Sequence, residues 1–74
     1  MTEFPTSDLQ LASYLRLLGH EPVRLDGDGR KRVFVFEDVP PEDLRDYDSG
    51  SRAVNVSQLF GHYRELRSRL FESR

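Results

Sequence analysis

The chain has 74 residues, of which 36% are hydrophobic, 32% charged and 11% aromatic. Its apolar residues recur at regular spacing, so the composition predicts one folded domain over residues 1–74 rather than a disordered segment. The absence of cysteine excludes disulfides, thiolate metal sites and cysteine nucleophiles. No apolar run is long enough to span a membrane and no secretory signal is evident, so we expect a cytoplasmic protein that does not enter a membrane.

The net charge of −2 is unevenly distributed along the chain. Residues 1–50 carry six basic and eleven acidic side chains, a net charge of −5, whereas residues 51–74 carry five basic and two acidic ones, a net charge of +3. Such asymmetry is typical of a polyanion-binding end, and it can equally let neighbouring copies attract each other. The overall acidity weighs against a dedicated nucleic-acid-binding protein.

The first expected elements are an N-terminal arm and a helix. The arm covers residues 1–6, and the helix is predicted from Asp8 to Leu18, with Ser7 as its N-cap and Gly19 as the left-handed residue that ends it. Its apolar residues cover more of the helix than one sheet face requires: Leu9, Leu11, Ala12, Tyr14, Leu15, Leu17 and Leu18. The helix is therefore expected either to lie centrally in the domain or to pack one flank against another copy of the chain.

Residues 21–36 predict a β-hairpin around an Asp-Gly-Asp-Gly turn. In the return strand, Val33 and Val35 face one way, while Phe34 and Phe36 face the other. A strand that is apolar on both faces is central in its sheet or has its second face covered. The first helix can cover one face, so the other would need the last helix, a second copy or a ligand.

The remaining chain predicts an acidic loop region, a third strand and a final helix. Residues 39–51 form the loop region, with one short helical turn, and residues 52–56 alternate as a short strand. Either Asn55 or Ser57 can cap the helix expected over residues 57–72. The predicted fold class is α+β, in the order α-β-β-(short α)-β-α, with a small antiparallel sheet packed against an N-terminal and a C-terminal helix.

Three blocks of sequence resemble a small family of bacterial and phage domains of unknown function. The blocks are Thr6-Ser7-Asp8-Leu9-x-Leu11-Ala12-x-Tyr14-Leu15 with Leu18-Gly19-His20, then Val33-Phe34-Val35-Phe36-Glu37-Asp38, then Val54-Asn55 before an amphipathic helix ending in Leu70-Phe71. Members of this family have about this length. The resemblance implies a compact α+β domain encoded by bacteria and their mobile elements, and it assigns no catalytic residue.

Motifs for metal binding and catalysis are weak. An EF-hand register that starts at Asp26 would place Arg30 and Lys31 where an oxygen ligand and a glycine are required, so a hairpin turn is favoured over a calcium loop. The histidines, His20 and His62, do not have the spacing of a helical metal site. No nucleophile elbow or phosphate loop is present. We therefore predict a non-enzymatic protein with no catalytic residue, metal or cofactor.

Two basic groups remain as candidates for nucleic-acid contact. One lies on the hairpin and the other on the last helix: Arg24, Arg30, Lys31 and Arg32, and Arg64 with Arg67. A basic two-stranded ribbon can track phosphates. The alternative is that these side chains are solvated or paired with acids such as Glu65. Exposed aromatic residues that would stack on bases are not expected, because Phe60 and Phe71 fit core or interface positions.

The sequence favours a small interaction module, a homodimeric accessory or regulatory protein of a bacterium or phage whose further protein partner is unknown. Three features favour a dimer: the return strand is apolar on both faces, the first helix is apolar around much of its circumference, and the chain is short. Six residues are candidates for the dimer interface: Tyr14, Leu17, Phe34, Phe36, Phe60 and Phe71. A nucleic-acid-binding regulator is the alternative.

Overall fold

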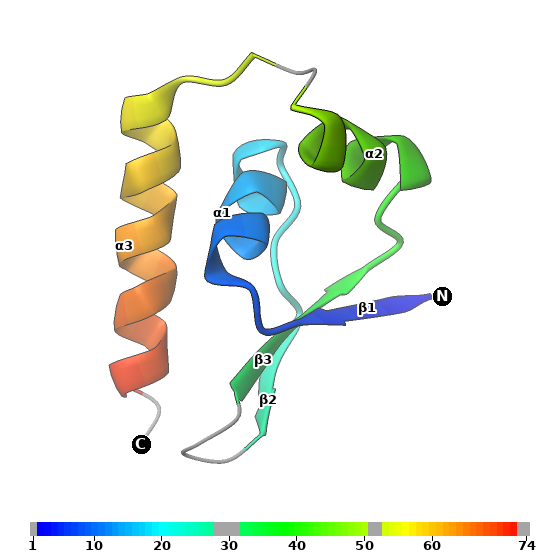
Figure 1. Cartoon of the computed structure of the whole chain (residues 1–74). Helices are drawn as coiled ribbons and strands as arrows, with labels where there is room; N and C mark the ends of the chain where they lie inside the picture. Colours follow the sequence, from blue (N-terminus) through cyan, green and yellow to red (C-terminus); the bar gives the residue numbers. More distant parts are fainter. Residues whose placement is uncertain (1, 28–31, 51–52, 73–74) are drawn as a thin grey trace.

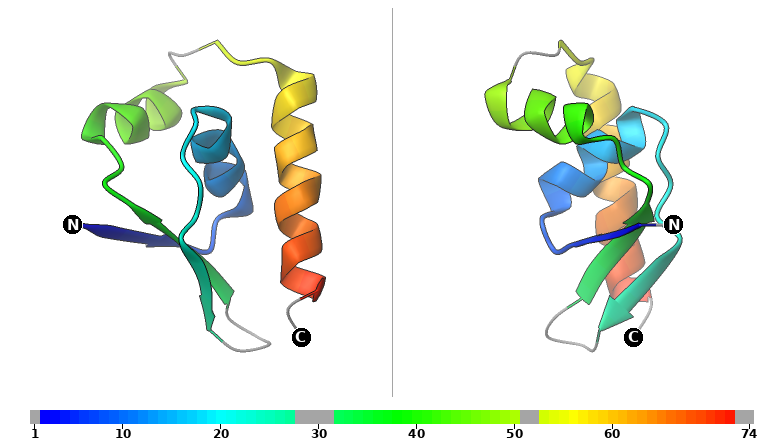
Figure 2. Two further views of the ribbon diagram at one scale, coloured as in Figure 1. Left: turned by 180° about the vertical axis from the view of Figure 1, so that it is seen from behind. Right: turned by 90° about the vertical axis from the view of Figure 1, so that its right-hand side faces the viewer.

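The computed structural model describes residues 2–27, 32–50 and 53–72. It is an α+β domain, as expected, with three strands and three helices (Figure 1). In chain order these are β1 (Glu3–Thr6), α1 (Leu9–Leu17), β2 (Arg24–Gly27), β3 (Arg32–Glu37), α2 (Pro41–Ser49) and α3 (Val56–Glu72). Helix α1 lies between α2 and α3, and the strands lie together at the other end of the domain (Figure 2). None of the described helices is long and apolar enough to cross a membrane.

The sheet is antiparallel and has the order β1-β3-β2, so β3 is the central strand, as its two apolar faces predict. The third strand is β1 and not the segment expected at residues 52–56. Phe4 of β1 pairs with Phe36, and Pro5 is tolerated because β1 is an edge strand, where a backbone N–H can be missing. Residues 53–55 lie outside any strand and lead directly into α3, while residues 51–52 lie outside the described part.

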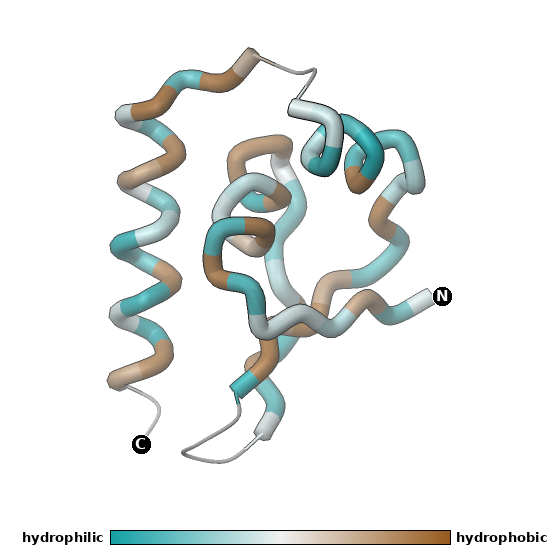
Figure 3. The backbone as a smooth tube through the Cα atoms, viewed as in Figure 1, coloured by the Kyte–Doolittle hydropathy of each residue, from teal (hydrophilic) through white to brown (hydrophobic). Residues whose placement is uncertain are grey.

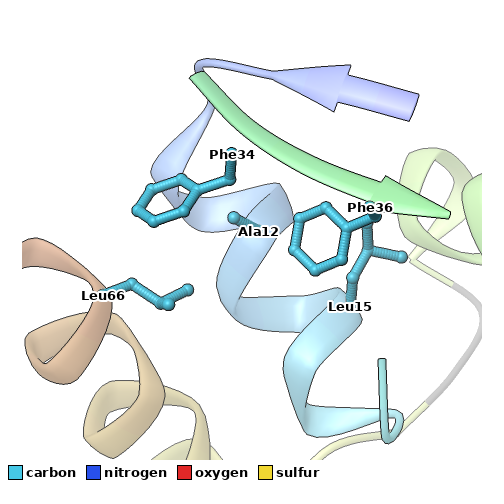
Figure 4. Packing of buried hydrophobic residues seen from close by; sticks show 5 residues of the cluster. All are labelled: Ala12, Leu15, Phe34, Phe36 and Leu66. Carbon is cyan, nitrogen blue, oxygen red and sulfur yellow. The ribbon is translucent and has the colours of Figure 1, made fainter. Parts of the chain in front are cut away.

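The core lies between the sheet and helices α1 and α3. It is formed by Ala12, Leu15, Phe34, Phe36 and Leu66, which come from α1, β3 and α3 (Figure 4). Both phenylalanine side chains of β3 point toward α1, and Leu66 of α3 faces the same cluster. Hydrophobic positions recur along α1, β3 and α3 (Figure 3). Both α1 and α3 therefore cover the same face of the sheet, which explains the wide apolar surface of α1.

The opposite face of the sheet is covered by the chain's own charged side chains. Val35 is only 2% exposed, although no helix lies over it. Arg24 on β2 donates hydrogen bonds of 2.7 and 2.8 Å to the two carboxylate oxygens of Glu3 on β1. Because β3 runs between these strands, this ion pair crosses over the central strand at Val35. The expectation that a last helix, a second copy or a ligand must cover this face is wrong.

Helix α1 begins one residue later than the sequence predicts. Its N-cap is Asp8, not Ser7, and Oδ1 of Asp8 accepts hydrogen bonds from the backbone N–H groups of Gln10 and Leu11, at 3.0 and 3.2 Å. The Asp8 N–H in turn donates to Oγ1 of Thr6, the last residue of β1. Strand β1, which precedes the cap, therefore fixes it. The sequence predicted this segment as part of an N-terminal arm.

Helices α2 and α3 also differ from the expected boundaries. The acidic segment at residues 39–51 is mostly helical, because α2 continues from Pro41 to Ser49 and ends at Gly50, which has a φ of 66°. Proline in the first turn and glycine at the end are both favoured helix boundaries. For α3, Oδ1 of Asn55 accepts a hydrogen bond from the N–H of Gln58 at 3.0 Å, so Asn55 is the N-cap and not Ser57.

Candidate interaction surface

A cleft of about 490 Å³ opens between the three helices. Its lining comes from α1 (Gln10, Ser13 and Tyr14), α2 (Tyr47) and α3 (Leu59, Phe60 and Tyr63). Four of these seven residues are aromatic and none is charged. The lining joins residues from Gln10 to Tyr63, more than half the length of the chain apart, so no local motif in the sequence could identify it. We call this site the aromatic cleft.

Two tyrosines connect α1 to α2 at the aromatic cleft. The ring centroids of Tyr14 and Tyr47 are 5.2 Å apart, and the rings are tilted by 56°. Tyr14 is only 5% exposed, and its buried hydroxyl has no hydrogen-bond partner in the described structure. Burial raises the pKa of Tyr47, and the negative charges of Asp8 and Asp48 raise it further. The α2 side of the cleft therefore lies in a negative electrostatic potential.

Beside the cleft, α3 exposes a line of apolar and basic residues. We call it the α3 stripe, and it comprises Val56, Phe60, Arg64, Arg67 and Phe71. Steps of four, four, three and four residues place all five within an arc of about 80° on a helix with 3.6 residues per turn. The three apolar members are 56–59% exposed, and the Arg67 guanidinium lies 5.8 Å from the centroid of the Phe71 ring.

The structure separates the six predicted interface residues into two groups. Tyr14, Phe34 and Phe36 are buried within the chain, so they offer no surface to a partner. Leu17 is half-buried. Only Phe60 and Phe71 are largely exposed, and both belong to the α3 stripe. We predicted the β3 phenylalanines as interface residues because the sequence alone does not show that α1 and α3 cover the same face of the sheet.

Within the part of the chain that the structure describes, the predicted basic residues are not brought together as one patch. Arg24 is held by Glu3 and by Asp26, whose carboxylate accepts from Arg24 Nε at 2.9 and 3.0 Å. Arg32 is half-buried, and Arg30 and Lys31 lie outside the described residues. Arg64 and Arg67 are exposed on α3 and are the two predicted basic residues that belong to the α3 stripe. Among these basic residues, the charge of Arg24 is therefore paired with neighbouring acids, through its contacts with Glu3 and Asp26.

A network of four charged side chains fixes α3 against α1. Arg16 on α1 contacts Glu65 at 2.7 Å and Glu21 at 3.3 Å. Arg69 contacts the same two glutamates at 3.2 and 3.1 Å. The hydrogen bond from Arg16 holds the pKa of Glu65 below its ordinary value. Glu65 and Arg69 therefore orient α3 so that the α3 stripe faces away from this network.

The structure also contains a histidine–carboxylate pair that the sequence analysis did not predict. Nε2 of His20 lies 2.8 Å from Oδ2 of Asp43, and the aspartate is 8% exposed. Neither residue lines the aromatic cleft. His62 lies apart on α3, and the described residues contain no group of three or more side chains that could hold a metal. No sequence spacing signals this pair, because its members lie 23 residues apart on different elements.

Comparison with known proteins adds one finding. Residues 1–71 match the family described as "Domain of unknown function (DUF5659)". No curated protein and no solved structure matches the chain. The resemblance to a family of unknown function is confirmed, and because the match covers nearly the whole sequence, the chain belongs to the DUF5659 family.

Proposed function

We propose that this domain is a small non-enzymatic interaction module that forms a homodimer through the α3 stripe and the adjoining α2 face. The observation that carries the proposal is the exposure of Val56, Phe60 and Phe71 along one line of α3. Val56 and Phe60 lie one turn apart on α3, and exposed apolar side chains that gather in this way mark interaction sites in small soluble domains. Such a module would serve as a cytoplasmic accessory or regulatory protein of a bacterium or phage.

Charge complementarity favours a second copy as the partner. The α3 stripe contributes the positive charges of Arg64 and Arg67, whereas α2 contains four acidic residues and one arginine. Tyr47 of α2 and Phe60 of α3 line the same cleft, so the basic and acidic helices flank one surface. A two-fold axis through this surface would set each α3 stripe against the acidic helix of the other copy, which is the self-complementary contact that a symmetric dimer requires.

Sedimentation equilibrium over a wide concentration range tests the dimer. We expect the average mass to rise from 8.6 kDa toward twice that value with increasing concentration. Phe60→Glu should keep the protein monomeric, because it places a charge in the apolar contact. Val23→Glu is the matched control, since Val23 is a similarly exposed apolar residue, and it lies directly before β2. A wild-type mass of 8.6 kDa at all concentrations would refute the dimer.

Single-stranded nucleic acid is the second candidate partner, and one observation favours it. Phe60 and Phe71 are exposed and alternate with Arg64 and Arg67 along α3, contrary to the expectation that these phenylalanines are covered. Aromatic rings beside arginines are the usual means of binding single strands without sequence preference.

Fluorescence anisotropy with labelled single-stranded DNA and RNA tests this candidate. Phosphate contacts release counterions, so binding should weaken steeply between about 50 and 200 mM salt. An Arg64→Gln, Arg67→Gln double variant should lose the binding, whereas Arg45→Gln, an exposed arginine on α2, should retain it. Equal binding by both variants, or none by the wild type, would reject nucleic acid as the partner.

A further inference from the structure

We infer that the aromatic cleft is a binding site for a compact organic cation of the alkylammonium or guanidinium class. The inference goes beyond the proposed homodimer, because it concerns a ligand inside the cleft, although Phe60 belongs both to the cleft lining and to the α3 stripe. Three observations carry the inference. Aromatic rings line the cleft, carboxylates lie beside it, and a buried hydroxyl in its lining has no hydrogen-bond partner among the described residues.

The size and lining of the cleft fit a small ligand. Its volume of about 490 Å³ lies within the usual range for small-molecule sites, about 300–1,000 Å³. Aromatic rings reach it from all three helices: Tyr14 from α1, Tyr47 from α2, and Phe60 and Tyr63 from α3. The negative face of an aromatic ring attracts cations, and groups of such rings recognise quaternary ammonium ligands. The lining contains no lysine or arginine that would repel a cation.

The charges beside the cleft favour a cation over an anion or a neutral molecule. Asp8 caps α1 and Asp48 lies next to Tyr47 on α2; both are exposed, and their charges act on the Tyr47 hydroxyl. Carboxylates near a partly enclosed aromatic surface attract a cation without needing to contact it. Arg64 and Arg67, the basic residues of the α3 stripe, are exposed and are not part of the lining.

The Tyr14 hydroxyl is the second structural sign of a ligand. Buried hydroxyl groups normally have a hydrogen-bond partner, and leaving one unpaired is unfavourable. Tyr14 lines the cleft, is 95% buried, and its hydroxyl has no partner among the described residues. A phenol oxygen accepts hydrogen bonds, and guanidinium and partly substituted ammonium groups are donors without acceptors. A cation of this class that reaches the Tyr14 hydroxyl would give a partner to the one buried polar group of the lining that has none among the described residues.

Two sources could supply this chemistry, namely a free small molecule and the side chain of an arginine or a methylated lysine in a peptide. Nuclear magnetic resonance titration of the ¹⁵N-labelled chain distinguishes them, with choline as one probe and N-acetyl-arginine methylamide as the other. The neutral choline isostere 3,3-dimethyl-1-butanol controls for apolar binding. We expect saturable shifts of the amides of Tyr14, Tyr47 and Tyr63 with one or both cations, and none with the isostere. The tighter cation identifies the source.

Substitutions separate the contribution of the Asp48 charge to cation binding from that of the Tyr47 ring. Asp48→Asn should weaken cation binding several-fold, whereas Glu42→Gln, an exposed acid earlier on α2, should leave it unchanged. Tyr47→Phe should retain binding and Tyr47→Leu should lose it, because the aromatic face and not the hydroxyl holds the cation at this wall. Equal binding of the isostere, or no saturable shift with either cation, would overturn the inference.

The titration is independent of the dimer if it is carried out at a concentration at which sedimentation shows one oligomeric state. Cation binding by a protein that stays at 8.6 kDa would support this site and reject the proposed homodimer. A chain that dimerises at high concentration but binds neither cation at a concentration at which it is a monomer of 8.6 kDa would do the reverse. The two proposals can therefore fail separately.

Discussion

Nε2 of His20 lies 2.8 Å from Oδ2 of Asp43, and this contact joins the end of α1 to the first turn of α2. The histidine is placed by Gly19, whose φ of 101° turns the chain after α1, and by a hydrogen bond from its own N–H to the Leu15 carbonyl. Asp43 is buried near the N-terminus of α2, where the helix dipole favours a negative charge. The pair therefore fixes the position of the helix that carries Tyr47 into the aromatic cleft.

Removing the histidine should destabilise the fold. His20→Ala deletes one partner of a largely buried hydrogen bond to a carboxylate, so we expect the free energy of unfolding to fall by about 1–3 kcal/mol. Urea denaturation at neutral pH measures this loss. His62→Ala is the control, because His62 makes no hydrogen bond in the described part of the chain, and it should cost about 0.5 kcal/mol or less. Equal losses in the two variants would show that the pair contributes nothing specific.

The cap of α1 provides a second prediction. Asp8→Ala removes the side chain that accepts two backbone N–H groups, so stability should fall by about 1 kcal/mol, the usual effect of losing an N-cap. Ser7→Ala, one residue earlier, should have little effect, because Ser7 is exposed and its side chain caps nothing. Chemical denaturation of both variants compares them directly. A larger loss for Ser7→Ala would restore the cap that the sequence favours.

Local patterns predicted most of the elements, because their causes are local. The periodicity of α1 and α3 and the alternation of Phe34 and Val35 each depend on residues close together in the chain. The strand β1 was missed because only four residues form it, and its pairing partner Phe36 lies 32 residues away. A short edge strand containing Pro5 has no strong signal of its own. The fold class could therefore be predicted, but not the position of the third strand.

The candidate site was less predictable than the fold. Phe60 and Phe71 were predicted as core or interface residues, and they are exposed in the single chain. Phe34 and Phe36 carry the same apolar signal but lie in the core, because burial depends on which elements cover them. Tyr47 lies in the segment predicted as an acidic loop region, yet it forms a wall of the aromatic cleft. A site formed by three separate helices depends on packing angles, which sequence periodicity does not contain.

A third prediction concerns Arg24, whose side chain can stabilise the sheet in two ways. It covers Val35, and it forms an ion pair with Glu3. Arg24→Ala removes both the pair with Glu3 and the side chain that crosses β3, so it should lower the thermal midpoint of unfolding. Arg24→Met removes the guanidinium, with its charge and hydrogen bonds, but keeps a long apolar side chain, so it should recover part of this loss, because an arginine stem also contributes packing. Thermal unfolding followed by circular dichroism gives the comparison. If methionine and alanine lower the midpoint equally, the ion pair and not the coverage stabilises this face.

The fourth prediction concerns acid stability and the ion-pair network of α3. The pKa of Glu65 is lowered in the folded protein, chiefly by its hydrogen bond with Arg16, so the folded state favours the ionised form. This contribution is present above the ordinary glutamate pKa of about 4.3 and is lost as the pH falls through the lowered folded-state pKa. Wild type should therefore be more stable than Glu65→Gln at neutral pH, and the difference should shrink as the pH falls through the lowered pKa of Glu65 and its carboxylate becomes protonated.

Urea denaturation of wild type and Glu65→Gln at neutral and acidic pH measures this difference. Glu42→Gln is the matched control, because Glu42 is exposed on α2 and forms no ion pair within the described structure. Its difference from wild type should be small at both pH values. At each pH, the free energies of unfolding of wild type and Glu65→Gln are compared, which cancels the contribution of carboxylates that titrate in both proteins. The change of this stability difference with pH therefore reports on Glu65. A Glu65→Gln difference that stays constant between the two pH values would mean that the contact of Arg16 with Glu65 does not depend on the glutamate charge.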